Sequence, residues 1–315
     1  MSTPGHSSRR RSGDSRRPRG GNALRIDSYE LIPEEVLPRI QALWLTCQTF
    51  DATTMPFNSD SSLNNHMGLP SHYLAYEESS LIGYLQLFHP RQEEVEVTGV
   101  THPDHRCRGV FSALLESARR EMSSWPVIER TIMVVDGMSE AGREYLRNRG
   151  ASLEDTEYLM ELTSPLQPPA IPSDFRIAEM GLEDVEPVAA LSVEVFPERA
   201  EDALLAIRRT VESEGRIEFK ATVSEVLVGF GGLSWEGDRA SIFGLGIAPG
   251  ERRKGYGSAL LYSLAREAVD RLPRGTAITL EVSEGNSGAL ELYRRLGFEV
   301  KGSYDYYQLP GMAAS

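Results

Sequence analysis

The sequence predicts an α/β protein made of two tandem copies of one fold, each a mixed central sheet flanked by helices. Three observations support this prediction. The chain has 315 residues, 40% hydrophobic and 25% charged, which suits two domains with packed cores. A fixed offset relates the two halves of the sequence, and a proline-rich segment separates them.

The offset is visible in matching stretches of sequence. LIGYLQL, from Leu81, matches LVGFGGL, from Leu227, at an offset of 146 residues. The same offset relates three further pairs, which are Pro103 and Pro249, Arg106 and Arg252, and Gly109 and Gly255. Self-similarity at one spacing indicates that each half is a structural unit.

The separating segment contains Pro165, Pro168, Pro169 and Pro172. Proline at this density blocks both helix and sheet interior, so the segment is expected to be a linker. The sequence therefore predicts a first domain over residues 23–163, a linker over 164–173 and a second domain over 174–310.

Hydrophobic periodicity predicts the elements of the second copy in order. Strands are expected over residues 175–178, 217–223, 226–234, 240–247 and 276–282, with a closing pair of strands over 299–309. Helices are expected over 185–195, 200–211 and 287–296. One more helix follows a glycine-containing loop and has apolar residues at helical spacing: Leu260, Leu261, Leu264, Ala265, Ala268 and Leu272.

Residues 1–22 have a different composition. The first 20 contain six arginines and one aspartate among Ser, Pro and Gly, so we expect a disordered tail. Two interpretations stay open, a solvated extension without a partner or a weak electrostatic contact with nucleic acid. No aromatic residue lies between the arginines for base stacking, which favours the first.

The rest of the sequence bears on the cellular location of the protein, the state of its thiols and metal binding. The sequence has no apolar stretch of about 18 residues and no secretory signal, so a cytoplasmic protein without a membrane partner is expected. Cys47 and Cys107 form neither a disulfide framework nor a CxxC pair, and reduced thiols are expected. His102, His105 and Cys107 have a spacing that a metal site could use, but no second ligand cluster exists, and no metal is expected.

One segment of the second copy has the features of an anion site. Residues 246–261 run as strand, tight loop and helix, and the loop spells RRKGYG from Arg252 to Gly257. Its two glycines permit a sharp turn with exposed amides, and the following helix directs its unpaired N–H groups to the same point. Basic side chains in the loop strengthen the attraction.

This segment resembles the GNAT superfamily of acetyl-CoA-dependent N-acetyltransferases, whose signature Arg252, Gly255 and Gly257 fill. The element LEVSEGNSGALELYRRLGF, residues 280–298, is similar to the family's second strand–helix motif. In this element the sequence most resembles the GNAT branch that acetylates ribosomal-protein N-termini. The resemblance spans most of residues 174–310.

The resemblance implies that acetyl-CoA is the co-substrate. The loop amides would hold its pyrophosphate, and the strand backbone before the loop would pair with its pantetheine arm. The coenzyme-binding residues that the resemblance implies are Leu245, Gly246, Ile247, Arg252, Arg253, Lys254, Gly255, Tyr256, Gly257, Ser258 and Asn286.

The resemblance also implies two catalytic residues. Glu281 would take the proton from the acceptor ammonium and Tyr293 would protonate the departing thiolate, since an ammonium is no nucleophile and a thiolate leaves better beside a proton donor. Spacing alone leaves other interpretations open. Glu281 alternates with apolar Leu280 and Val282, as a solvated glutamate would, and a half-buried tyrosine on a helix is often structural.

The first copy lacks parts of this pattern. Phe111 stands where the second copy has Gly257. At an offset of 147, the positions of Glu281, Asn286 and Tyr293 are occupied by Val134, Ser139 and Leu146. We therefore expect a degenerate first copy with a structural or substrate-shaping role and the active site in the second.

The predicted function is transfer of an acetyl group from acetyl-CoA to an amine by direct attack in a ternary complex. The acceptor is expected to be a small-molecule amine or a protein or peptide amine, and the sequence does not choose between them. The alternative is a non-catalytic acyl-CoA-binding sensor or scaffold. Retention of Glu281, Asn286 and Tyr293 favours the enzyme.

Overall fold

The computed structural model describes residues 24–310 except 59–63, 66–67, 124 and 126–127. The Arg-rich tail predicted over residues 1–22 lies outside the described residues. The described chain divides into two compact units. One contains the residues up to Thr156 and from Tyr304 onward, and the other contains Glu157–Ser303.

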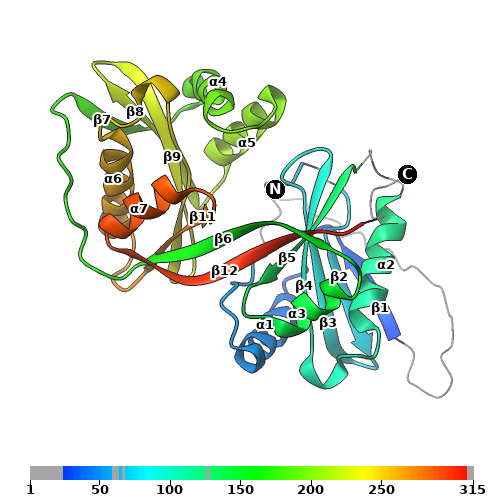
Figure 1. The fold of residues 1–315 in the computed structure, drawn as a ribbon. Coiled ribbons are helices and arrows are strands. Elements are labelled where there is room, and N and C mark those ends of the chain that lie inside the picture. The colour runs from blue at the N-terminus through cyan, green and yellow to red at the C-terminus, as the bar shows by residue number, and fades with distance from the viewer. Residues whose placement is uncertain (1–23, 59–63, 66–67, 124, 126–127, 311–315) are drawn as a thin grey trace, which may run out of the picture. The chain divides into compact units, whose positions relative to one another are not determined.

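The first unit is a mixed sheet with strand order β1-β2-β3-β4-β5-β12. All neighbours are antiparallel except β4 and β5, which are parallel. In this unit, α1 and α2 lie on opposite sides of β3 and β4 (Figure 1). Its elements are β1 Leu24–Tyr29, α1 Leu37–Asp51, β2 His72–Glu77, β3 Ser80–Phe88, β4 Glu94–Thr101, α2 Val110–Met122, β5 Arg130–Asp136 and α3 Glu140–Arg147.

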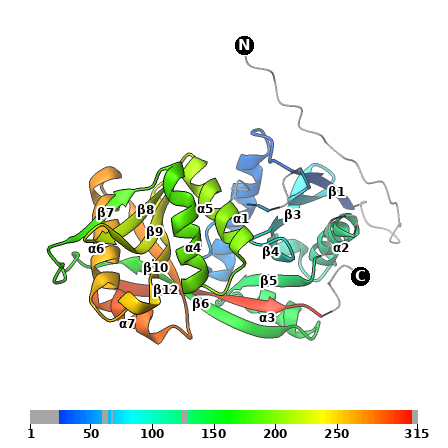
Figure 2. The ribbon, with the colours of Figure 1, turned by 90° about the horizontal axis from the view of Figure 1, so that it is seen from above.

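The second unit repeats this arrangement with strand order β6-β11-β10-β9-β8-β7, and β10 and β11 are its parallel pair. In Figure 2, α6 and α4 lie on opposite sides of β8 and β9. Its elements are β7 Phe175–Glu179, α4 Val185–Val195, α5 Ala200–Glu212, β8 Arg216–Val223, β9 Val226–Glu236, β10 Arg239–Ile247, α6 Tyr256–Arg271, β11 Ala277–Ser283 and α7 Ser287–Arg295.

Two long strands belong to both units. The strand β6, Ser152–Leu162, pairs through its second half with β11 of the second unit. The strand β12, Phe298–Gln308, pairs through its second half with β5 of the first unit. The expected closing pair of strands over 299–309 is therefore wrong. The chain stays extended through Gly302 and Ser303 instead of turning, and continues into the sheet of the other unit.

The second unit has a different apolar core on each face of its sheet. The α6 face packs Leu260, Leu261 and Leu264 against strand residues that include Phe219 and Leu280. Of the six predicted apolar positions of α6, all but Leu272, which follows the helix end, are buried. The opposite face packs α4 and α5 around Phe230. Because side chains alternate along a strand, each strand residue is assigned to one of these faces.

Deletion of residues 304–315 tests the role of β12 in the first unit. The deletion removes the residues that pair with Ile132–Asp136, so the outer edge of β5 loses its ladder partner. Amide exchange of Ile132–Asp136, measured by mass spectrometry, should accelerate by about tenfold or more, because unpaired edge amides open more readily. Exchange of β9 and β10 serves as the control and should change little. Unchanged protection of β5 would contradict the pairing.

Candidate active site

The site begins where two parallel strands part. Pairing of β10 with β11 extends from Arg239↔Ala277 to Ile242↔Leu280, although both strands continue beyond those residues. The register of β10 with β9 also shifts between Phe243 and Gly246. Such a bulge bends a strand away from its neighbour. The β10 backbone after Phe243 therefore has an edge that β11 does not pair.

Gly244 makes this bulge possible. Its φ is +60°, in the left-handed region that glycine adopts without a steric penalty. The expected pantetheine-binding residues Leu245, Gly246 and Ile247 follow it directly. In the described strands no β11 residue pairs with them. The resemblance predicts that the pantetheine arm pairs along this edge.

The glycine loop leads from the end of β10 into α6. Gly255 is the N-cap of α6 with φ +90°, and Arg253 also has a positive φ of +66°. The first N–H groups of the helix, from Tyr256 to Ser258, have no partner within the helix. A Cβ added to Gly257 would lie no closer than 3.6 Å to any atom, so the protein itself leaves room there. The helix start can therefore accept an anion.

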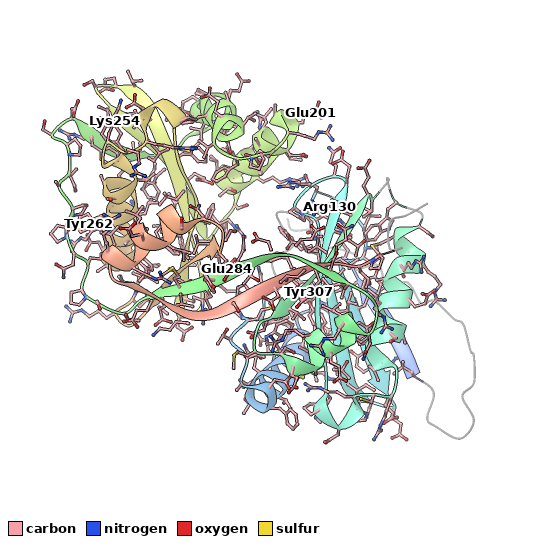
Figure 3. All side chains as sticks on the ribbon, viewed as in Figure 1. Arg130, Glu201, Lys254, Tyr262, Glu284 and Tyr307 are labelled. Carbon is pink, nitrogen blue, oxygen red and sulfur yellow. The ribbon has the colours of Figure 1, made fainter. Side chains whose placement is uncertain are left out.

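Two of the predicted basic side chains hold the loop together. The Nε of Arg252 donates to the carbonyl of Ile247 at 3.1 Å, which fixes the loop to the strand end. Lys254, labelled in Figure 3 in the loop before α6, forms an ion pair with Glu251 at 2.9 Å. Their charges lie near the helix start, but each side chain also has a structural partner.

Asn286 is the N-cap of α7. Its Oδ1 accepts a hydrogen bond from the amide of Ala289 at 3.2 Å. This contact fixes the side chain at the start of the helix, and its NH2 group remains as a donor for a ligand.

Glu281 lies on β11 one residue past the last β10–β11 pair. Its neighbours Leu280 and Val282 face the α6 core, so Glu281 faces the opposite side, that of α4 and α5. The side chain keeps access to solvent, yet protein atoms crowd its carboxyl. Burial of the carboxyl and the nearby Glu157 raise its pKa to about 7, against a lowering effect of Arg239. A carboxyl with this pKa suits a general base near neutral pH.

Tyr293 lies on the other face of the sheet. It projects from α7 into the α6 core, is 8% exposed, and its ring centroid is 6.5 Å from that of Phe298. Burial raises its pKa to about 12, so the phenol keeps its proton at neutral pH. The two predicted catalytic residues thus lie on opposite faces of the sheet in the region where β10 and β11 part.

The first copy reproduces the loop. The Nε of Arg106 donates to the carbonyl of Thr101 at 3.1 Å, as Arg252 does to Ile247. Gly109 is the N-cap of α2 with φ +79°. Ser139 caps α3 through the amide of Gly142 at 3.2 Å, in the position that Asn286 has in the second copy.

The first copy differs in the parting of its strands. Its parallel strands pair only as far as Val97↔Met133, but the register of β3 with β4 has no bulge from Gly83↔Thr101 to Phe88↔Glu96. A cavity of about 420 Å³ lies here. Residues from both strands, α2 and α3 line it, among them Val97, Gly99, Phe111, Val134, Tyr145 and Arg149.

Aromatic and basic side chains occupy the helix start of the first copy. The ring of Phe111 contacts that of Tyr145 with centroids 5.0 Å apart. The guanidinium of Arg149 lies 3.9 Å above the Tyr145 ring and donates to Ser112 in the first turn of α2 at 2.9 Å. The open space beside Gly257 in the second copy has no counterpart at Phe111.

A loop covers the other face of the first copy. Asp136, two residues after Val134 on β5, accepts hydrogen bonds from the amides of Thr54 at 2.6 Å and Met55 at 2.8 Å. These residues follow α1, so the loop is held over the strand end on the face where the second copy presents Glu281.

Sequence reasoning missed three features of the second copy. These are the bulge, the proximity of Glu157 and Arg239 to Glu281, and a buried carboxyl at Glu218 on the same face. Gly244, next to the predicted strand end, was the available signal for the bulge. No sequence feature indicated that Glu157 lies near Glu281, because Glu157 reaches this sheet from the first half of the sequence.

No cluster of three or more potential metal ligands occurs among the residues that the structure describes. Within the same residues, every helix is too short or too polar to cross a membrane. Both cysteines are free thiols.

Comparison with known proteins gives a family match and several relatives. Residues 182–298 match the family described as "Acetyltransferase (GNAT) family". The chain is 27% identical over 236 residues to a mycothiol acetyltransferase of Clavibacter michiganensis subsp. michiganensis, covering 65% of this chain and 69% of the relative. It is 25% identical to a mycothiol acetyltransferase of Kineococcus radiotolerans, covering 85% of this chain and 91% of the relative.

Solved structures share the fold across both units. A GCN5-related N-acetyltransferase from Sphaerobacter thermophilus superposes with a TM-score of 0.71 at 20% identity, covering 90% of this chain and 95% of the other. A tandem GNAT protein from the clavulanic acid biosynthesis pathway gives a TM-score of 0.70 at 15% identity, covering 90% and 98%. These likenesses confirm the predicted architecture of two tandem folds.

Replacement of Gly257 by alanine separates ligand binding from stability. Gly257 is helical and has room for a methyl group, so Gly257→Ala should stabilise the fold by up to about 1 kcal/mol. The methyl group would occupy space beside the phosphates, so acetyl-CoA affinity should fall by about tenfold. Calorimetry and thermal unfolding measure the two effects. A variant with unchanged affinity would show that the phosphates bind elsewhere.

Proposed function

The chain belongs to the GNAT family of acetyl-CoA-dependent N-acetyltransferases, and on that premise we propose that its second copy performs the transfer. The acetyl group passes from acetyl-CoA to an amine by direct attack in a ternary complex. The observation that supports the proposal most is the end of the β10–β11 pairing at Ile242↔Leu280, which places Glu281 beside the unpaired edge of β10.

In this mechanism the coenzyme lies along β10 with its phosphates at the start of α6. The amine approaches from the α4 and α5 face, where Glu281 accepts a proton from the ammonium. The neutral nitrogen attacks the thioester carbonyl, and an amide of the β10 edge stabilises the developing oxyanion. As the C–S bond breaks, the nitrogen loses its second proton to Glu281, which has released the first to solvent. Tyr293 donates its proton to the thiolate and regains one from solvent.

The acceptor that we propose is a small-molecule amine. The two relatives compared above are named mycothiol acetyltransferases, so mycothiol-related amines belong in the first panel. Release of coenzyme A thiol from acetyl-CoA with each amine tests the proposal. Binding of acetyl-CoA without acetylation of any amine would favour the sensor or scaffold alternative.

The first copy is proposed to be non-catalytic. Val134 and Leu146 cannot transfer protons, and the loop held by Asp136 covers the face from which an amine would approach. The cavity of the first copy could still bind a coenzyme, because binding does not require the residues that transfer protons.

Conservative substitutions test the two proton-transfer residues. Glu281→Gln and Tyr293→Phe should each lower kcat by roughly 10²- to 10⁴-fold while acetyl-CoA affinity stays nearly unchanged, because each removes one proton transfer. Steady-state kinetics with one good amine measures this. If both variants keep full turnover and Gly109→Val in the first copy abolishes it, the active site lies in the first copy and the assignment to the second is wrong.

The pH dependence of kcat/KM tests the base separately. With a pKa of about 7, Glu281 is protonated at lower pH and cannot accept a proton. The rate should therefore rise as pH increases through about 7. In Glu281→Gln this limb should disappear, and the defect should shrink at high pH, where the amine is already neutral. An identical limb in wild type and variant would remove Glu281 from the base role.

A further inference from the structure

A row of four residues crosses the acceptor face of the second unit. Glu218 on β8 is opposite Gly232 on β9, and Gly232 is opposite Phe243 on β10. The last β10–β11 pair, Ile242↔Leu280, brings Glu281 next to Phe243. The aromatic ring therefore lies in a row between two carboxyl side chains on one face of the sheet.

The glycine in this row positions the ring. A Cβ on Gly232 would lie 2.3 Å from Cζ of Phe243, so the Phe243 ring leans over β9 toward Glu218. Any larger residue at this position would displace the ring. Phe243 is only partly buried, so part of it is available for contact with a ligand.

Glu218 is a buried carboxyl with one unused oxygen. The residue is 7% exposed, and its Oε2 has no hydrogen-bond partner in the described part of the chain. Burial raises its pKa to about 8, and the charge of Arg216 only partly opposes this effect. Leaving such an oxygen unpaired is costly, and a cationic partner would remove the cost.

Arg216, two residues earlier on β8, is the positive charge that lowers the pKa of Glu218, and it does not cancel the effect of burial. Lys220, two residues along β8, is engaged with Asp184 at 2.5 Å. The helix α5 packs against β8 and adds Asp202, another buried carboxyl whose Oδ2 lacks a partner among the described residues. Arg239 lies four residues before Phe243, near the other end of β10.

We propose that the acceptor is an amine with a second cationic group, separated from the reacting nitrogen by an apolar chain. The reacting nitrogen lies at Glu281, the chain crosses the Phe243 ring, and the distal cation binds Glu218. This inference rests on the proposed function and specifies its substrate class. Three strand spacings separate the two glutamates, about 14 Å between backbones, and the two side chains shorten that span.

Each part of the row has a physical reason to favour such a ligand. A cation near an aromatic face is attracted to the ring quadrupole. The methylene groups of the ligand bury apolar surface against the exposed part of the ring, which lowers the free energy of binding. With a pKa of about 8, the Glu218 carboxyl is mostly protonated at neutral pH. The distal cation would replace that proton and form a charge-assisted hydrogen bond with the carboxylate, which a monoamine of the same chain length cannot do.

Two amines of equal chain length test the proposal, diaminooctane and octylamine. Wild-type kcat/KM should favour the diamine by about tenfold or more, the effect of one charge-assisted bond. In Glu218→Gln this ratio should fall to near one. Phe243→Leu should lower the ratio as well, and it serves as the second variant if Glu218→Gln does not fold. Glu225→Gln removes an equal charge at the exposed β8–β9 turn and should keep the wild-type ratio.

The outcomes distinguish this inference from the proposed function. If wild type acetylates both amines equally, or if the ratio survives in Glu218→Gln and Phe243→Leu, the second-cation site is wrong while the acetyltransferase assignment stands. If wild type binds acetyl-CoA and acetylates no amine of any panel, the proposed function fails, and the inference fails with it.

Discussion

The early end of pairing between β10 and β11 is the constraint on which the site depends. Below Ile242↔Leu280 the two strands form an ordinary parallel ladder. Above it the bulge at Gly244 turns β10 away, and its backbone groups become available to a ligand. In the proposed mechanism, the same parting lets groups on the two faces of the sheet act on one bond. Glu281 is on the α4 and α5 face, and Tyr293 is on the α6 face.

The two copies show which parts of this arrangement the fold alone maintains. Both keep the arginine that bonds the strand end, the left-handed glycine at the helix start and the polar cap of the following helix. These contacts stabilise a loop whether or not chemistry occurs. The first copy lacks the bulge, the open glycine and both residues proposed for proton transfer. Its differences are therefore concentrated at the positions that would touch substrates, while the framework is preserved.

Sequence reasoning reached the local parts of the structure. The glycine loop and the helix periodicity of α6 both depend on residues close together in the chain, so their pattern is visible in the sequence. The strands β6 and β12 each begin in one unit and pair in the sheet of the other. This arrangement depends on pairings between distant segments, such as Glu281↔Leu159 and Tyr304↔Asp136. Nothing local marks these pairings. Glu157 and Glu218 were missed for the same reason, because their role comes from the face and the row that they share with Glu281.

Amide exchange with and without acetyl-CoA tests the central claim most directly, because both copies are observed in one experiment. If the coenzyme lies along β10 and its phosphates bind at α6, amides of residues 244–247 and 255–258 should gain protection on addition of acetyl-CoA. Protection confined to residues 98–101 and 109–112 of the first copy, with no change in the second, would contradict the account.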